Sequence, residues 1–314
     1  MSTLDPTLEP LSTDAEPEPA TPVVDGRPPV LRTLIRREFW EHRALWIAPL
    51  SVAALLLVGA IIGKVSFDSD VATPEQRRAL FGVFMAYAAI PQFITVGIIT
   101  LMYAGDCLYT ERKDRSILFW KSMPVSDTLT VVAKMLVVML IVPLGVYVVS
   151  ALTTLLLSGV YLVRAWHDHV GNVYWDAGTW LRIQGISLVT EVAGVLWYAP
   201  ITAFLMLVSA WARRSVWLWV LLPPVVLIMM ERIALGSNHV MTVLLYRLGG
   251  VFANAGPQFP GTAAAAGPRS TLNLLFANVD PLPVFANADL WLGLGVAALL
   301  IVATIRIRQY RDDT

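Results

Sequence analysis

The sequence predicts an all-α membrane protein with six transmembrane helices, and three observations lead to this fold class. Of the 314 residues, 56% are hydrophobic and only 15% are charged, whereas a soluble domain carries about 25% charged residues. The mean hydropathy of +0.64 and the 11 tryptophans are also typical of a membrane protein. Finally, six nearly uncharged runs approach the roughly 20 apolar residues that a spanning helix needs.

Residues 1–30 are expected to form a disordered cytoplasmic tail. The segment is rich in proline and acidic residues, and Arg27 is its only basic residue. It lacks both the basic start and the apolar core of a secretory signal peptide. Such a composition buries too little apolar surface to order the chain. The remaining residues, 31–314, are predicted to be one six-span transmembrane domain.

The segment 31–43, "LRTLIRREFWEHR", predicts an amphipathic helix ahead of the first span. Leu31, Leu34, Ile35 and Phe39 recur at helical spacing, and most charged residues fall on the opposite face. A basic amphipathic helix of this kind lies in the membrane interface instead of crossing it. The alternative is that the segment simply extends the first span into the cytoplasm.

The six predicted spans cover residues of about 44–63, 79–105, 131–163, 183–212, 215–235 and 286–306. The fifth reaches spanning length only by including Glu231 and Arg232, and the sixth needs residues from the preceding loop. Between them, the long segment 236–289 contains two apolar pieces around a Gly/Pro/Ala-rich loop. These pieces predict short re-entrant or outer helices before the sixth span.

The distribution of basic residues predicts that both termini are cytoplasmic. With the N-terminus inside, 15 of the 23 lysines and arginines fall on the cytoplasmic side. The turn between the fourth and fifth spans is only a few residues long and contains Arg213 and Arg214. Short basic loops stay in the cytoplasm under the positive-inside rule. We therefore expect a multi-pass membrane protein with both termini in the cytoplasm.

Motifs for catalysis are missing from the sequence. It contains no phosphate-binding loop, no H-E-x-x-H metal motif and no G-x-S-x-G nucleophile elbow. His167 and His169 flank an aspartate, but residues two apart do not share a helix face and further ligands are lacking. We therefore expect no enzyme activity, no catalytic residue, no metal site, no cofactor bound by this chain and no nucleic-acid partner.

One acidic residue, Glu191, falls inside a predicted span. Intramembrane carboxyl groups are rare and often functional. Glu191 is therefore a candidate for lining a substrate path, or alternatively for pairing with Arg232 near the outer end of the fifth span. No series of acidic residues crosses the membrane, which disfavours a proton-coupled mechanism.

The most polar part of the chain, "TERKDRSILFWKSMPVSDT" at residues 110–128, lies between two apolar spans. Glu111 and Arg115 are spaced as helical i,i+4 partners, and Pro124 ends the predicted helix. Ser126 or Asp127 can then cap the third span. Apolar side chains within a charged rim are typical of a protein–protein contact. The rim comprises Glu111, Arg112, Asp114 and Arg115, and the apolar side chains are Ile117, Leu118, Phe119 and Trp120.

The stretch "DRSILFWKSMPVSDTLTVVAK", residues 114–134, resembles the segment after the second span in permease subunits of bacterial ABC transporters of the type-2 exporter class. The amphipathic N-terminal helix, the six spans and the ending "LWLGLGVAALLIVATIRIRQYRDD" are also similar to that family. The likeness extends from Leu31 to the C-terminus, but only residues 114–134 are specific. The acidic, proline-rich tail departs from the family pattern.

This resemblance implies how the chain functions. The polar segment would be a coupling helix that docks on a separate ATP-binding subunit, present in two copies and carrying ATP and Mg. Residues 31–43 would be an interfacial connecting helix. A second permease copy, identical or related, would complete the export path. Two other functions stay open, an ATP-independent secondary transporter and a membrane scaffold that recruits a soluble partner. The substrate is not indicated by the sequence.

Overall fold

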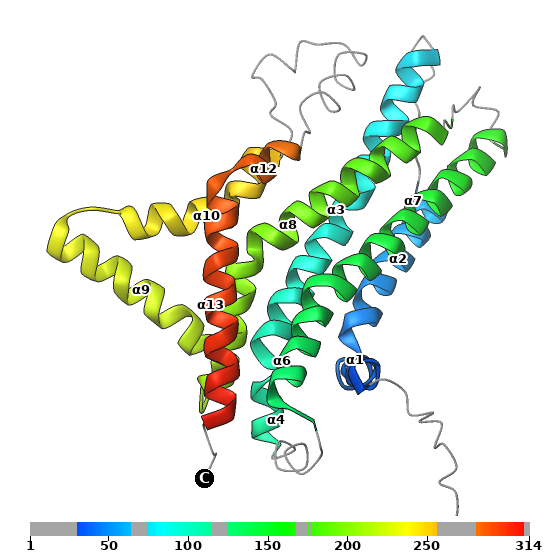
Figure 1. Ribbon diagram of the computed structural model, residues 1–314. Helices are drawn as coiled ribbons and strands as arrows, with labels where there is room; N and C mark the ends of the chain where they lie inside the picture. Colours follow the sequence, from blue (N-terminus) through cyan, green and yellow to red (C-terminus); the bar gives the residue numbers. More distant parts are fainter. Residues whose placement is uncertain are drawn as a thin grey trace, which may run out of the picture.

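The structure, a computed structural model, describes residues 30–63, 74–114, 125–167, 175, 177–255 and 281–310. Throughout these residues the protein is all-helical, and most of the long helices run side by side along one bundle (Figure 1). Six helices are long and apolar enough to cross a membrane, which confirms the predicted fold class at this level and indicates a multi-pass membrane protein.

The helices agree closely with the predicted spans. Among the described residues, one further helix precedes the first span, one follows the second, and two lie between the fifth and the sixth. In chain order the elements are α1 (Val30–Glu41), α2 (Ala44–Ile62), α3 (Pro74–Asp106), α4 (Tyr109–Lys113), α6 (Asp127–Leu136), the π-helix η1 (Val137–Ile141), α7 (Val142–His167), α8 (Ala177–Trp211), α9 (Val216–Leu235), α10 (His239–Ala255), α12 (Leu282–Ala286) and α13 (Ala288–Tyr310).

The third span is one continuous rod made of α6, η1 and α7. It begins where predicted, because the Ser126 side chain accepts a hydrogen bond from the Leu129 backbone N–H at 3.2 Å. The π-helical turn ends two residues before Pro143. Its wider hydrogen bond runs from the Val142 N–H to the Val137 carbonyl. A proline ring clashes with the carbonyl four residues earlier, and the wider turn relieves this clash.

Helix α8 occupies the middle of the bundle and packs along both α3 and α13, while α2 packs on α7 and α3. The largest apolar core cluster joins α3, the α6–η1–α7 rod and α8, with Val131, Val137 and Met206 fully buried. Helix α9 differs from the others, because Val216 is its only buried residue. Figure 1 shows α9 diverging from the bundle and returning through α10.

The start of α1, the α4 helix and the C-terminal end of α13 all lie at one end of the bundle, which we call the terminal end (Figure 1). Helix α1 is seen end-on there, whereas the long helices run within the plane of the picture. Helix α1 therefore lies across the spans, the arrangement that an interfacial helix would adopt. Its Trp40 is 67% exposed.

A tight hairpin joins α9 to α10. Gly236 adopts a left-handed backbone conformation (φ 65°), which suits glycine because it has no Cβ. The Glu231 carboxylate then caps α10, accepting hydrogen bonds from the backbone N–H groups of His239 (2.6 Å) and Val240 (2.7 Å). A carboxylate is favoured at a helix N-terminus, where backbone donors are otherwise unpaired.

Helix α10 is attached to α8 by close contact between a tryptophan and a glycine. The fully buried Trp197 of α8 donates its indole N–H to the Arg247 carbonyl at 2.8 Å. The Arg247 guanidinium lies 4.6 Å from the centroid of the same ring. Gly250 passes so near that a Cβ there would lie 2.5 Å from the Trp197 ring. Helices α10 and α12 lie in the segment where outer helices were expected. Residues 256–280, between them, fall outside the described part of the chain.

Candidate functional site: a buried ionic cluster

Six charged side chains meet at the terminal end of the bundle and are held together by ion pairs. We call this set the ionic cluster. Among the described residues it contains three bases and three acids. Its members are Arg37 and Glu38 of α1, Glu111 of α4, Asp127 and Lys134 of α6, and Arg308 of α13.

Glu111 is the centre of the ionic cluster. Its Oε1 atom is 2.9 Å from Arg37 Nη2 and 3.1 Å from Lys134 Nζ, and its Oε2 atom is 2.8 Å from Arg308 Nη1. Only 4% of the side chain is exposed. One carboxylate thus binds cations from three different helices. A buried carboxylate is stable only with such compensation, because removing a charge from water costs several kcal/mol.

Lys134 lies between two carboxylates and is completely buried. Its Nζ atom is 2.7 Å from Glu38 Oε1 in addition to its contact with Glu111. The other oxygen of Glu38 accepts a hydrogen bond from the Tyr103 hydroxyl of α3 at 2.7 Å. Every charged atom of this group therefore has a partner, as a buried polar network requires.

Arg308 joins the last span to the first turn of the third. Its Nε atom donates to Asp127 Oδ1 at 2.8 Å while Nη1 holds Glu111. The ionic cluster consequently ties α1, α4, α6 and α13 to one another. Two of its members, Glu111 and Asp127, lie in the sequence on either side of residues 115–124, which make up most of the predicted coupling segment. A displacement of that segment would act directly on these four helices.

A second set of contacts ties α4 to the end of α8. The backbone N–H groups of Leu108 and Tyr109 donate to Ser209 Oγ at 3.1 and 3.0 Å. The Arg112 guanidinium donates to the carbonyl oxygens of Ser209 and Ala212 at 2.5 and 2.8 Å. A cation at the carbonyl end of a helix is favourable, since those carbonyls lack intrahelical donors.

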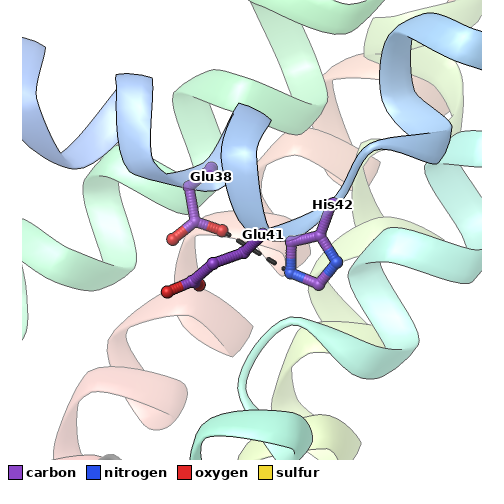
Figure 2. Close-up of side chains that lie close together, drawn as sticks. All are labelled: Glu38, Glu41 and His42. Carbon is purple, nitrogen blue, oxygen red and sulfur yellow. Dashed lines mark ion pairs between the residues drawn. The ribbon is translucent and has the colours of Figure 1, made fainter.

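Glu38, Glu41 and His42 bring three ligand-type atoms within 4.8 Å of one another, and Figure 2 shows their side chains on α1 and just after it. Both carboxylates already bind cations, however. Glu38 holds Lys134, and Glu41 is paired with Arg37 at 2.5 Å. These two cations repel a metal ion from the same oxygens, so this trio is better explained as the edge of the ionic cluster.

His42 makes the edge of the ionic cluster sensitive to pH. Burial lowers the pKa of His42 below its ordinary value of 6.5, and the Glu38 carboxylate, 3.8 Å from Nε2, only partly opposes this shift. The unfolded chain therefore binds a proton more readily than the folded one. It follows that the folded state is stabilised above the ordinary pKa and loses this stabilisation as the pH falls through the lowered pKa.

We therefore expect a His42→Gln variant to lose less thermal stability than the wild type on acidification below about pH 6.5. Melting temperatures of both proteins in the same detergent, measured across a pH series, provide the check. Other titrating groups act equally in both proteins and cancel in the difference. Parallel curves would show that His42 does not contribute.

The residues predicted to contact a partner divide into three groups in the structure. Glu111 and Arg112 are engaged inside the bundle, as described above. Asp114 is exposed at the C-terminal end of α4, which ends at Lys113. The remaining members lie outside the described residues, so their contacts stay predictions. They are Arg115, Ile117, Leu118, Phe119 and Trp120.

Glu191, the other predicted site residue, is far from the ionic cluster. It lies in α8, 18 residues before Ser209, which corresponds to roughly 27 Å along the helix. The side chain is 8% exposed. It forms no hydrogen bond or ion pair with any described residue, so the alternative pairing with Arg232 is not observed.

Sequence reasoning missed most of the ionic cluster, because it treated the basic residues as markers of orientation. A signal was nevertheless present. Glu38 shares the apolar face of its helix with Leu34. Lys134 similarly shares a face with the buried Val131 and Val138. A charged residue on the apolar face of an amphipathic helix predicts a buried partner of opposite charge.

Comparison of the chain with protein-family models, with curated proteins and with solved structures finds no match in any of the three.

Proposed function

We propose that the chain is the permease subunit of an ATP-driven ABC exporter in the bacterial inner membrane, with both termini in the cytoplasm. In this proposal a separate subunit binds and hydrolyses ATP with Mg, and two copies of it serve a pair of permeases. The pair is this chain with a second copy or a related chain. The observation that carries the proposal is the ionic cluster, which connects the predicted coupling segment to four helices.

The position of the ionic cluster supports a mechanical role. The segment 115–124 leaves α4 two residues after Lys113 and returns three residues before α6 begins. Glu111 precedes it and Asp127 follows it, and both are bound to Arg308. An ATPase that displaced the segment would therefore move α6 and α13 together. Since α1 is bound to Glu111 through Arg37, it would follow the same motion.

The docking surface proposed for the ATPase consists of the side chains between α4 and α6. Asp114 and Arg115 would form ion pairs with the partner, and Ile117, Leu118, Phe119 and Trp120 would enter its cleft. We assign Glu111 and Arg112 to transmission of the movement, because their side chains are engaged with α1, α6, α8 and α13. Glu191 is proposed to line the path.

Charge reversal at Asp114 and truncation of Trp120 are expected to separate the two subunits. The Asp114→Lys, Trp120→Ala double variant should lose about thirtyfold or more in affinity for its ATPase partner, since interface hot spots of this kind are worth about 2 kcal/mol or more. The measurement is co-purification of the two subunits from membranes, followed by the ATPase activity of the reconstituted complex.

The matched control is Arg306→Glu, which reverses an exposed charge at the same end of the bundle but outside the segment. It should leave co-purification unchanged. If the double variant co-purified as well as this control and stimulated ATP hydrolysis were retained, the docking surface would be misplaced. If no ATPase bound the wild-type chain, the exporter function itself would be refuted.

An ATP-independent secondary transporter is the second candidate function, and one observation favours it. Glu191 is a buried carboxyl group in a spanning helix with no partner among the described residues. Coupling ions in secondary transporters bind at such groups near the middle of the membrane. Transport driven by an ion gradient in vesicles without ATP would distinguish this candidate from the exporter.

A further inference from the structure

The middle of the bundle contains a carboxyl group that no other part of the described structure neutralises. Glu191 is 8% exposed and lies 14 residues into the 35-residue helix α8. An isolated carboxylate at this depth is energetically unfavourable, because the lipid and the packed helices exclude the water that would solvate it. Such a residue is retained at a cost in stability, which indicates a ligand that compensates its charge.

None of the cations that the structure describes on neighbouring helices compensates Glu191. Arg164 of α7 donates to the Ala60 and Gly63 carbonyls at the C-terminal end of α2. Arg247 of α10 is held by Trp197 and by the Asp289 carbonyl of α13. Arg112 of α4 and Arg308 of α13 are bound at the terminal end. Arg232 of α9 is exposed.

The acidic groups and phenols on the same neighbouring helices are also placed elsewhere. The described acids lie towards the ends of their helices, and the hydroxyls of Tyr103, Tyr147 and Tyr246 donate to other groups. Glu191 is therefore buried with no charged neighbour among the described residues. These groups are Tyr103 and Asp106 of α3, Glu111 of α4, Tyr147 and Tyr161 of α7, Glu231 of α9, Tyr246 of α10, and Asp289 and Tyr310 of α13.

Two further buried polar atoms lack hydrogen-bond partners among the described residues. Gln92 of α3 donates its amide N–H to the Pro49 carbonyl, but its Oε1 atom is buried and unpaired. Thr190, next to Glu191, has a buried and unpaired Oγ1 atom. The contact of Leu108 with Ser209 sets the register of α3 against α8. Gln92 is 16 residues before Leu108, about 24 Å, so it lies at a depth similar to that of Glu191.

Polar side chains lead from the opposite end of the bundle towards this depth. Gln184, two turns before Glu191 on the same face of α8, donates to Thr154 Oγ1 of α7 at 3.1 Å. Trp180 donates to the same hydroxyl at 3.3 Å. Ser158 of α7, one turn nearer the opposite end than Thr154, donates to the Thr154 carbonyl. Buried polar groups that are bonded to one another therefore lie between the opposite end of the bundle and the depth of Glu191.

We propose that Glu191, with Gln92 and Thr190, binds one monovalent cation. The cation is either a proton, which turns the carboxyl group into an O–H donor, or a small ammonium ion beside the carboxylate, which brings its own N–H donors. The unpaired atoms are a carboxylate, an amide oxygen and a hydroxyl, all of which accept hydrogen bonds. Three such side chains are too few for Ca²⁺, which takes six to eight oxygen ligands. This proposal concerns the chain alone and needs no ATPase.

Labelling of the purified full-length chain with dicyclohexylcarbodiimide tests the proposal. The O–H of a protonated carboxyl group adds across one C=N bond of the reagent, and the acyl group then migrates to nitrogen, so nothing leaves. We expect mass spectrometry to find the label on Glu191 and not on Glu38 or Glu111, which are bound by cations. A Glu191→Gln variant should remain unlabelled.

Two arms of the experiment distinguish the ligands. If the ligand is a proton, labelling should fall by about tenfold per pH unit once the carboxyl group ionises, and methylammonium should have no effect at fixed pH. If the ligand is an ammonium ion, methylammonium chloride should protect Glu191 severalfold relative to sodium chloride of equal ionic strength, and Thr190→Val should weaken that protection.

Labelling that changed with neither pH nor methylammonium, or no labelling under any of these conditions, would overturn the proposal. Because the pH series and the methylammonium series are performed on the wild-type chain, these two results do not depend on whether the variants fold. It is also separate from the exporter function. A labelled Glu191 in a chain that binds no ATPase would leave this inference intact while refuting the other.

Discussion

Replacement of Lys134 by methionine is expected to destabilise the protein by about 3–5 kcal/mol, the range for breaking a buried ion pair by removing one partner. Lys134 is completely buried and contacts Glu38 at 2.7 Å and Glu111 at 3.1 Å. Methionine has a similar size but no charge, so it would leave two carboxylates facing one another with one cation fewer. Denaturant unfolding in a mild detergent, followed by tryptophan fluorescence, would measure the loss.

The matched control is Lys113→Met, because Lys113 is also a lysine at the terminal end but is exposed. It should change stability by less than about 0.5 kcal/mol, as surface substitutions usually do. A Glu38→Gln, Lys134→Met double variant restores the charge balance and should recover part of the loss, which a double-mutant cycle would quantify. Equal stability of Lys134→Met and Lys113→Met would show that the ionic cluster is not formed.

Replacement of Gly250 by alanine is expected to detach α10 from α8 and to lower stability by about 1–3 kcal/mol, the usual range for overpacking. A Cβ atom at this position would lie 2.5 Å from the Trp197 ring, a distance that real contacts do not reach. Trp197 cannot move aside easily, because it is fully buried and hydrogen-bonded to the Arg247 carbonyl.

Gly249 offers a control in the next position of the same helix, since a Cβ there meets nothing within 4 Å. Alanine favours a helix over glycine by about 1 kcal/mol, so Gly249→Ala should be neutral or stabilising. Comparison of the two variants by thermal unfolding removes this helix propensity from the difference. A Gly250→Ala variant as stable as Gly249→Ala would contradict the close contact with Trp197.

The six spans could be predicted well, because a spanning helix needs a long apolar run and little else in the chain provides one. The start of the third span could be placed from Ser126, whose side chain caps it. The extra turns at helix ends were harder to predict. For example, the fourth span was expected at residues 183–212, but α8 begins at Ala177. A helix continues beyond its apolar run wherever local capping and packing allow.

The direction in which charged side chains point was not predictable from the sequence. Glu111 and Asp114 both belong to the polar segment, yet Glu111 is 4% exposed and bound by three cations while Asp114 is exposed. A charge pattern fixes which side of the membrane a loop prefers, but it does not show which charges meet. The partners of Glu111 come from positions 37, 134 and 308, and only the folded chain brings these together.

The sequence by itself determined that this protein is a bundle of six membrane-spanning helices with a polar segment between the second and third. Hydrophobic length and helical periodicity are local properties, and they act before any tertiary contact forms. Only the tertiary structure decided that Arg37, Glu38, Lys134 and Arg308 serve as partners for one another and for Glu111. Buried charges must be compensated within a few ångströms, and such distances between remote residues depend on how the helices pack.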